Sequence, residues 1–334
     1  MTNPSQCDVL GIGNAIVDVL SRVDDDFLVR EGLAKGSMRL VDADEADRLY
    51  KKIGAATESS GGSAGNTVAG VASLGGSAAF IGKIAEDQLG DIFRHDMRAV
   101  GVSFDSTALV HGEPTARSII LVTPDGERTM NTYLGAAQAL GPDDIKRDLV
   151  GSARITFLEG YLWDPADAKA AFRVAAEIAH EAKRRVALTL SDSFCVDRYR
   201  AEFLELIRND VVDIVLANTS ELKSLYETAD LKTGLQALSN DCRLAAVTAS
   251  EDGAHVISAG EITHVPADPI PELVDATGAG DLFASGFLYG IAHDWAPPAA
   301  AALGAFAAAE VITHIGARPA VSLEGAARRA GFVL

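Results

Sequence analysis

The sequence contains few cysteines, no cluster of positive charge and no apolar run long enough for a membrane helix. Its 334 residues include three cysteines, Cys7, Cys195 and Cys242, which lie far apart and form no CxxC pair. This small, odd number argues against a disulfide framework and against a zinc site. We therefore expect the chain to work in a reducing compartment, the cytoplasm.

Positive charge is scarce as well, with 29 Lys and Arg residues against 47 Asp and Glu residues and a net charge of -18. Because nucleic-acid binding depends on neutralising phosphates, we do not expect a nucleic-acid partner. The Ala-rich stretch 299–312 is too short to span a bilayer and contains Glu310, which predicts a buried helix. The segment MTNPSQCDVLGIG has no basic residues ahead of its apolar run, so neither a secretory signal nor a membrane partner is expected.

Strand-like and helix-like segments alternate along most of the chain. Short apolar runs such as CDVLGIG, RVALTLSD, VDIVLAN and RLAAVTAS read as buried strands, and most are followed by a helix-like segment. This alternation predicts an α/β fold with a mainly parallel sheet covered on both faces. Two segments, near 14–40 and 112–135, break the rhythm, and the second carries a TPDG turn between two β-like runs. We expect them to form a small β-rich lid within one domain spanning residues 1–334.

Two common phosphate-binding motifs are missing. The chain contains no GxxxxGK[ST] loop. The run GIGNAI offers Gly11 and Gly13 after the first predicted strand, but Ile16 stands where a dinucleotide fingerprint needs its third glycine. These absences argue against a P-loop ATPase and against an NAD-dependent enzyme.

The stretch TGAGD, from Thr277 to Asp281, offers a different way to bind phosphate. If a helix begins near Gly280, the amides of Gly278, Ala279 and Gly280 point out of its end and form an anion site. Asp281 then lies close enough to accept the proton of an attacking hydroxyl. The helix dipole is expected to keep this carboxylate ionised and only weakly basic. Asp281 alone would fit a helix cap, but a cap requires no run of small residues before it.

Several motifs together resemble the PfkB, or ribokinase-like, carbohydrate kinase family. DATGAGDLFASGF resembles one signature of the family and GGSAGNTVAGVASLGG the other, while ANTSE and VTASEDGAHV resemble its N-x-x-E element and its nucleotide-binding strand. The resemblance runs from about residue 8 to residue 316. It implies a ribokinase-like three-layer α/β sandwich with a β-rich lid, ATP as phosphoryl donor, Mg2+, and a primary hydroxyl as acceptor. A requirement for a monovalent cation such as K+ stays open.

The resemblance also implies roles for individual residues. Asp281 is the expected base, and Gly278, Ala279 and Gly280 form the expected anion hole. The expected acceptor-binding residues are Asn14, Asp18, Gly61, Gly62, Ser63 and Asn66. The expected ATP-binding residues are Asn218, Thr248, Ser250, Gly253 and Thr277, together with Gly278 and Gly280. Glu221 is expected to act on Mg2+ through water, and Arg128 to reach the transferring phosphoryl group from the lid.

Several of these residues also have an ordinary structural explanation. Asn14 and Asp18 fit a turn after a strand, Ser220 fits a helix cap with Glu221 in the first turn, and Arg128 fits a solvated arginine beside a hairpin. The chain also departs from the family pattern, with Ala276 where a second threonine is frequent and Ala249 or Ser250 where a glycine is frequent. These departures leave the anion hole and the base in place. They make the expected ATP contacts around Thr248, Ser250 and Gly253 less defined.

Within the family, GNAIVDVLSRVDDDFLVREGL and the segment from Thr189 to Asn218 resemble the group that phosphorylates adenosine to AMP. A nucleobase requires flat apolar walls, which six residues could provide: Ile16, Met38, Met130, Leu134, Tyr161 and Phe194. Core packing is the alternative for each of them. A sugar kinase acting on ribose, fructose or a sugar acid, and a non-catalytic sensor on the same fold, remain alternatives, and the chain is expected to be a monomer or homodimer.

Overall fold

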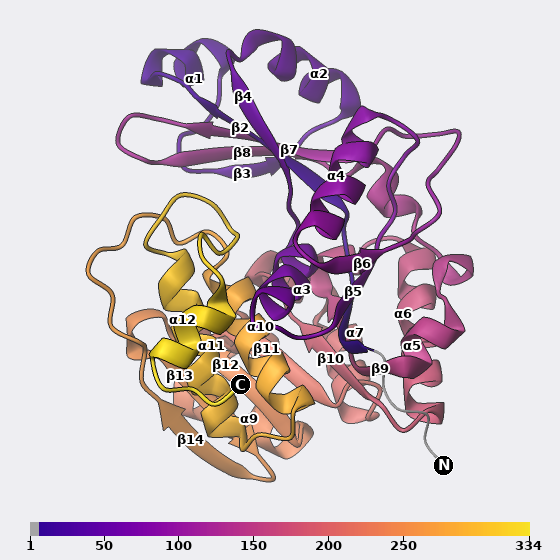
Figure 1. The fold of residues 1–334 in the computed structure, drawn as a ribbon, viewed down its shortest axis with the longest axis vertical. Helices are drawn as coiled ribbons and strands as arrows, with labels where there is room; N and C mark the ends of the chain where they lie inside the picture. Colours follow the sequence, from indigo (N-terminus) through magenta and orange to yellow (C-terminus); the bar gives the residue numbers. More distant parts are fainter. Residues whose placement is uncertain (1–6) are drawn as a thin grey trace.

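A nine-stranded, mainly parallel sheet forms the centre of the molecule (Figure 1). The computed structural model describes residues 7–334. Across the sheet the strands run in the order β14-β13-β12-β11-β10-β9-β1-β5-β6. Among these described strands the antiparallel pairings are β12 with β13 and β13 with β14, so β13 runs against the others. Their bounds are β1 Cys7–Ile12, β5 Ala78–Ile81, β6 Val102–Phe104, β9 Ala153–Glu159, β10 Arg185–Thr189, β11 Ile214–Asn218, β12 Leu244–Thr248, β13 Ala254–Ser258 and β14 Glu261–Val265.

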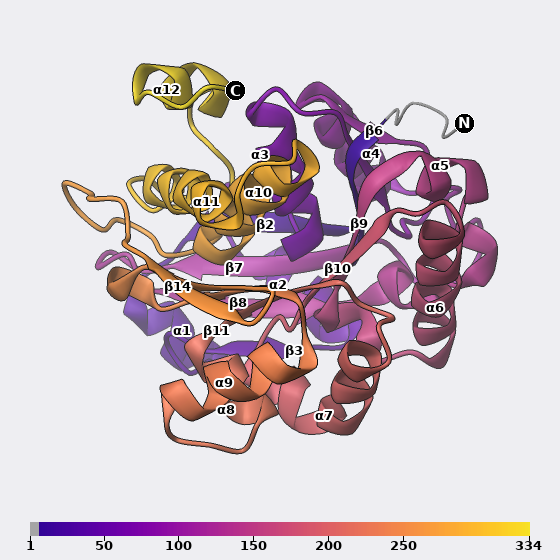
Figure 2. The same ribbon diagram turned by 90° about the horizontal axis from the view of Figure 1, so that it is seen from below.

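Helices cover both faces of this sheet (Figure 2). One core lies under α3 Ser63–Ser73, α4 Gln88–Ala99, α10 Ala279–Ala292, α11 Pro297–Val311 and α12 Leu323–Arg329. The other lies under α5 Arg147–Ser152, α6 Ala166–Glu181, α7 Ser193–Arg208, α8 Thr219–Leu225 and α9 Leu231–Asp241. Short 3-10 turns occupy Gly135–Ala139 (η1), Pro142–Asp144 (η2), Gly160–Trp163 (η3) and Ser250–Asp252 (η4). The expected helix–sheet–helix sandwich is confirmed.

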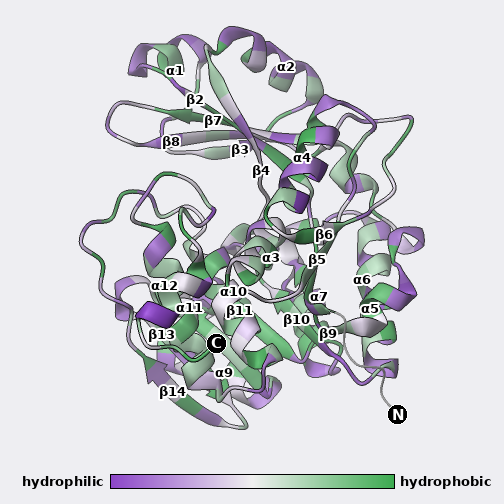
Figure 3. Cartoon of the chain, viewed as in Figure 1, coloured by the Kyte–Doolittle hydropathy of each residue, from purple (hydrophilic) through white to green (hydrophobic). Residues whose placement is uncertain are grey.

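Strand β1 shows why this chain forms such a sheet. Its residues are almost all buried, because it is paired with β5 on one side and β9 on the other and covered by helices above and below. Gly11 belongs to this packing, since a Cβ there would lie 2.8 Å from Cγ1 of Val68 in α3. Figure 3 shows hydrophobic residues along the central strands and α10, and hydrophilic residues on the outward sides of α4 and α6.

A second, five-stranded sheet forms the lid, in the order β3-β8-β7-β2-β4. The bounds of its strands are β2 Ile16–Arg22, β3 Met38–Leu40, β4 Ala56–Ser60, β7 Ala116–Val122 and β8 Arg128–Tyr133. Helices α1 Asp25–Glu31 and α2 Ala43–Lys52 cover its outer face over a small core that includes Leu49, Ile119 and Leu121. The lid therefore also contains α2 and β4, beyond the segments expected from sequence.

The other face of the lid sheet looks toward the main sheet. The register pairs Met38 with Met130, Met130 with Ile120, and Ile120 with Leu20, so these side chains share one face. Asp18 lies on the same face, two residues before Leu20. The same register places Ser118, Thr132 and Arg128 on this face, so a surface of mixed polarity with one carboxylate covers the space between the two sheets.

Helix α11 matches the expected buried helix near 299–312. Across residues 7–334, none of the helices combines the length and the apolar character that crossing a membrane requires.

Candidate active site

The candidate site lies where the parallel strands of the main sheet end, beneath the lid. Asn14 follows β1, Glu159 ends β9, Asn218 ends β11 and Thr248 ends β12. In a parallel sheet these carboxyl ends lie along one edge, which is the usual place for a ligand. The N-termini of α3 and α10 reach the same region, since Ser63 of α3 contacts Asp281 of α10.

The turn before α10 leaves three amides without a protein acceptor. Gly278 is the N-cap of α10 and has φ 82°, and a Cβ there would lie 2.7 Å from Cα of Ala317. The amide of Leu282 donates to the carbonyl of Gly278 at 2.8 Å. The amides of Gly278, Gly280 and Asp281 have no acceptor among the described residues. They form a concentrated donor site at a helix N-terminus, as an anion requires.

The expectation that all three small residues offer free amides is wrong for Ala279. Its N–H donates to the carbonyl of Ala276 at 3.2 Å, because the chain makes a tight turn into the helix at this point. The amide of Asp281 takes its place in the set of free donors.

Asp281 is held by the first turn of α3. Ser63 Oγ donates to one carboxylate oxygen at 2.7 Å, and Asn66 Nδ2 donates to the other at 2.9 Å. Burial raises the pKa of Asp281, while the two hydrogen bonds and the charge of Arg318 act against this increase. The expected weakening of the base by the helix dipole is therefore wrong in direction, because desolvation is the larger effect. The result is a better proton acceptor.

Asp18 approaches the same space from the lid. Its carboxylate lies on the bare backbone of Gly61, where a Cβ would be 2.3 Å from Oδ2. Gly62 lies equally close to the carbonyl of Asn14, with 2.4 Å between a built Cβ and that oxygen. Burial raises the pKa of Asp18 to about 6, helped by the charge of Asp281 and opposed by Arg318 and Arg128. Gly61 thus lets the lid carboxylate enter the site, and Gly62 lets the chain after β1 pass close to the start of α3.

Glu159 is a site residue that the sequence reasoning missed. Its Oε1 accepts from Asn14 Nδ2 at 2.7 Å and from the Asn14 amide at 3.3 Å, and its Oε2 accepts from the Ala64 amide at 2.8 Å. Burial raises its pKa to about 7. Asn14 itself is 1% exposed, and no described residue bonds to its Oδ1, which leaves a buried acceptor for a ligand hydroxyl.

The raised pKa values predict how stability depends on pH. Asp18, Glu159 and Glu221 have pKa values of about 6, 7 and 7 in the folded chain, against ordinary values of 3.8, 4.5 and 4.5. The folded state therefore keeps protons that the unfolded state has lost, and stability decreases as pH rises through 6 to 7. Burial lowers the pKa of His255, so this one group makes stability increase with pH, against the three carboxyl groups.

We expect the free energy of unfolding of the ligand-free protein to be lower at pH 7.5 than at pH 5.5, by on the order of 2 kcal/mol. Urea titrations at the two pH values measure this difference. The variant Asp18→Asn should show a smaller difference, whereas Asp91→Asn, on the exposed side of α4, should leave it unchanged. A protein more stable at pH 7.5 would contradict the assignment of these carboxyl groups.

A second group of polar residues lies on β11, β12 and α8. Asn218 caps α8, since its Oδ1 accepts from the amides of Ser220 and Glu221 at 2.8 and 2.9 Å, and Glu221 Oε2 accepts from the Asn218 amide at 2.9 Å. The cap is Asn218 and not Ser220, because only Asn218 has the extended backbone of an N-cap. Glu221 is buried, and burial raises its pKa to about 7.

Thr248, Ser250 and Gly253 lie at the end of β12 and in the turn that follows. Ser250 has φ 51°, in the left-handed region that favours glycine, which fits the frequent glycine at this point of the family pattern. Thr248 Oγ1 is 3.5 Å from the carbonyl of Ala217, in the neighbouring strand.

No cluster of three or more His, Cys, Asp or Glu side chains that could hold a metal occurs in the part of the chain that the structure describes. Mg2+ keeps several waters and binds largely through substrate phosphates, so the buried carboxylate of Glu221 is the group that would hold its water shell here.

The expected apolar wall is divided between the lid and the main sheet edge. Ile16, Met38 and Met130 lie on the inner face of the lid, and Leu134 follows β8. Tyr161 lies in η3 after β9, and Phe194 is in the first turn of α7. Core packing is excluded for the three that are exposed: Met38 (47%), Tyr161 (39%) and Phe194 (80%).

Arg128 forms a largely buried ion pair with Asp275, just before the TGAGD turn. Asp275 also accepts from the amides of Thr277 at 3.0 Å and Gly316 at 2.8 Å. Arg128 is therefore not a solvated arginine. It joins the lid to the turn, in agreement with Figure 1, where the segments before α10 and after α11 reach toward the lid. Asp275 is a second residue that the sequence reasoning missed.

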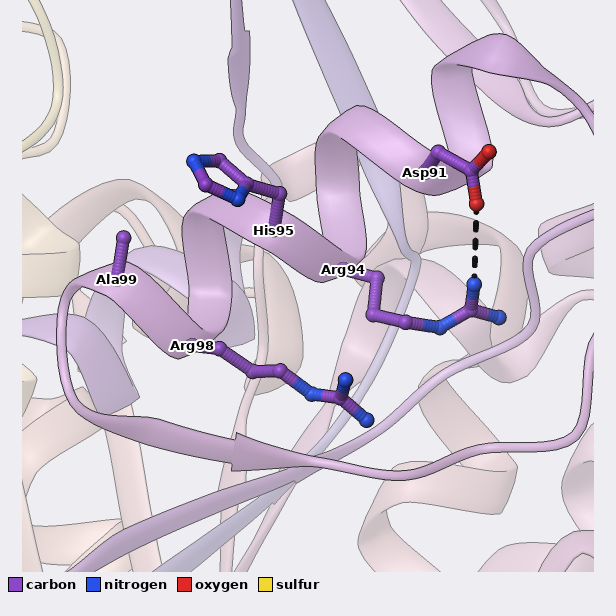
Figure 4. Close-up of a pocket in the computed structure, with 5 residues that line it drawn as sticks. All are labelled: Asp91, Arg94, His95, Arg98 and Ala99. Atoms are coloured by element: carbon purple, nitrogen blue, oxygen red, sulfur yellow. Dashed lines mark hydrogen bonds and ion pairs between the residues drawn. The ribbon is translucent and has the colours of Figure 1, made fainter.

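A surface hollow along α4 is separate from this site (Figure 4). It is lined by Asp91, Arg94, His95, Arg98 and Ala99. Arg94 pairs with Asp91 at 3.1 Å, and Arg98 donates to the carbonyl of Phe104. The basic side chains point in different directions and the arginines are already engaged, so they do not converge on a ligand.

Residues 33–323 match the model of the pfkB family carbohydrate kinases, and the chain belongs to this family. It is 56% identical to the adenosine kinase from Sinorhizobium meliloti, with a TM-score of 0.92 over 98% of this chain and 100% of that one. A probable sugar kinase from Rhizobium etli CFN 42 is 53% identical, with the same TM-score and coverage. The ATP-dependent ribose-1-phosphate kinase from Halopiger xanaduensis is 31% identical over 72% of this chain and 78% of its own length.

These findings confirm the expected ribokinase-like fold and the expected family. The chain is a phosphotransferase with an alcohol group as acceptor.

Proposed function

We propose that this protein transfers the γ-phosphoryl group of ATP to the 5'-hydroxyl of adenosine, giving AMP. The observation that carries the proposal is the turn before α10, which combines free amides of Gly278 and Gly280 with the carboxylate of Asp281. The similarity to the adenosine kinase from Sinorhizobium meliloti supports adenosine as the acceptor.

The polar residues of the site are suited to hold a ribose. Asp18 can accept from two neighbouring hydroxyls, and the buried Oδ1 of Asn14 can accept from a third donor. Gly61 and Gly62 leave room for Asp18 and for the Asn14 carbonyl beside the proposed sugar site, while Ser63 and Asn66 fix Asp281. The exposed side chains of Met38, Tyr161 and Phe194 offer apolar surface for the base.

Asp281 acts as the base of the proposed reaction. It accepts the proton of the acceptor hydroxyl as the new P–O bond forms and the bond to the leaving ADP breaks. The amides of Gly278, Gly280 and Asp281 donate to the oxygens over which negative charge spreads. Arg128 is proposed to reach the transferring phosphoryl group from the lid, and its ion pair with Asp275 holds it next to the same turn.

The nucleotide is proposed to lie along the ends of β11 and β12. Asn218, Thr248, Ser250, Gly253 and Thr277 would line this region, and Glu221 would hold water around Mg2+. Mg2+ neutralises charge on the phosphates when it is bound. A monovalent cation such as K+ is a further candidate activator, which a comparison of turnover in potassium and in choline buffers tests.

Closure of the lid removes water from the site. The inner face of the lid carries apolar side chains such as Met38 and Met130 beside its polar ones, so approach of the lid to the main sheet would exclude solvent and align the hydroxyl with the phosphoryl group. We place the reaction in the cytoplasm, in keeping with the three free cysteines, and propose that a monomer or homodimer carries it out.

A sugar is the second candidate acceptor, favoured by the similarity to the probable sugar kinase and to the ribose-1-phosphate kinase. Turnover of Mg-ATP with adenosine, inosine, ribose and fructose separates the two. We expect adenosine to give a kcat/KM at least about a hundredfold above the sugars, because only a nucleoside fills both the polar and the apolar part of the site. Turnover of a sugar with none of adenosine would overturn the proposal.

The same assay tests the alternative of a non-catalytic nucleoside sensor. Binding of adenosine without formation of AMP in the presence of Mg-ATP would favour the sensor and reject the kinase.

A further inference from the structure

Arg318 lies beside the site but belongs to none of the motifs that define it. It follows α11, and its guanidinium contacts three separate elements. Nε donates to Asn66 Oδ1 of α3 at 2.8 Å, Nη2 donates to Ser60 Oγ at the end of β4 at 3.2 Å, and Nη2 is 3.5 Å from Met97 Sδ of α4. One side chain therefore joins the C-terminal segment, the edge of the lid and the helix that carries Asn66.

The contact with Asn66 decides how that residue faces Asp281. An asparagine side chain has one accepting end and one donating end. Arg318 can only donate, so it holds Oδ1 of Asn66 and turns Nδ2 toward Asp281, to which it donates at 2.9 Å. With the amide reversed, an oxygen would face the carboxylate oxygen, and the hydrogen bond would become a repulsion.

The charge of Arg318 is not neutralised by its direct contacts, because Asn66, Ser60 and Met97 are all neutral. Three carboxylates from three elements lie near enough to act on it: Asp18 of β2, Asp96 of α4 and Asp281 of α10. Burial lowers the pKa of Arg318 to about 10, and these carboxylates oppose the shift, so the group is still charged at neutral pH.

The other charges around Asp281 do not replace this one. Glu159 and Asp18 are further carboxylates facing it, from β9 and β2. Arg128, from β8, is engaged in its ion pair with Asp275. Without Arg318 the site would hold several carboxylates with little compensation, and such groups share protons.

We infer that Arg318 is a positioning residue for the proposed phosphoryl transfer, which orients the Asn66 amide toward Asp281 and supplies the cation that faces Asp281 and Asp18. The inference rests on the proposed function, since it assigns the base to Asp281. It assigns two separable tasks to one side chain. Orientation needs the forked guanidinium, whereas compensation needs only a positive charge.

Two substitutions separate these tasks. Arg318→Met removes both, and we expect the acidic limb of the pH profile of kcat/KM to move to higher pH by about one unit, while kcat at high pH stays reduced as it does in Arg318→Lys. Arg318→Lys keeps the charge, so the limb should stay in place while kcat decreases, because one ammonium cannot replace both directed bonds. Arg328→Met, at an exposed helical pair with Glu324, is the control and should match the parent protein.

A titration without turnover keeps this test independent of the proposed function. The carboxyl carbon of Asp281, followed by NMR in the ligand-free protein, should titrate at higher pH in Arg318→Met than in the parent and in Arg318→Lys. If the parent protein forms no AMP, the proposed function fails while this titration still decides the inference. Equal titration curves in all three proteins would overturn it, and so would an Arg318→Lys protein that does not fold, since the arginine would then serve the fold.

Discussion

Asp281→Asn is expected to reduce kcat by about a thousandfold or more while leaving the affinity for adenosine within a few-fold of the parent value. General-base catalysis contributes about 10²–10⁴ in rate, and asparagine cannot accept the proton. The amide oxygen of asparagine can still accept from Ser63 Oγ, whereas its NH2 group would face Asn66 Nδ2, so one of the two hydrogen bonds that hold this residue should persist. Steady-state kinetics give kcat, and calorimetric titration gives the affinity.

The matched control is Asp91→Asn, which makes the same chemical change on the exposed side of α4 and should leave both quantities unchanged. A similar melting temperature for all three proteins would show that the loss is one of chemistry. Near-normal turnover of Asp281→Asn would mean that another group is the base, and Glu159 or Asp18 would then be examined first.

Gly280→Ala is expected to remove most of the activity without loss of stability. A Cβ at Gly280 meets no protein atom within 4 Å, and the residue lies in the first turn of α10, where alanine is the better helix former. The methyl group would instead occupy the space from which an anion approaches the free amides. We expect kcat/KM for ATP to decrease about a hundredfold, comparable to the loss of an oxyanion-hole donor, with an unchanged or slightly higher melting temperature.

Gly278→Ala provides the contrast within the same turn. Here the backbone has φ 82° and a Cβ would lie 2.7 Å from Cα of Ala317. Both the strain and the clash are expected to lower the melting temperature as well as the activity. A Gly280→Ala protein with full activity would show that phosphate does not approach this turn, whatever the stability of the two variants.

The part of the site that could be predicted from sequence is the part that depends on neighbouring residues. The run from Thr277 to Asp281 encodes a turn, a helix start and a carboxylate within five positions, and the structure has all three. Strand–helix alternation likewise predicted the layered fold, because the period of the pattern is local. The polar strand β4, with the sequence ATESS, was missed because it alternates no apolar residues.

The residues that could not be predicted act across long separations in the chain. Glu159 bonds to Asn14 over 145 positions, and Arg318 bonds to Asn66 over 252. Neither belongs to a local motif, so only the packed structure brings them together. The basicity of Asp281 was misjudged for the same reason, since the helix dipole is visible in the sequence whereas burial by α3 and the lid is not. Of the two, only Glu159 has a signal in the sequence, because it is a carboxylate at the end of an otherwise mostly apolar strand.

The most direct test of the account is a crystal structure with adenosine, Mg2+ and a non-hydrolysable ATP analogue bound together. We predict that oxygens of the γ-phosphate accept hydrogen bonds from the amides of Gly278 and Gly280, and that the 5'-hydroxyl donates to Asp281 in line with the phosphorus. A γ-phosphate bound elsewhere, or a 5'-hydroxyl out of reach of Asp281, would contradict the assignment of this turn as the catalytic centre.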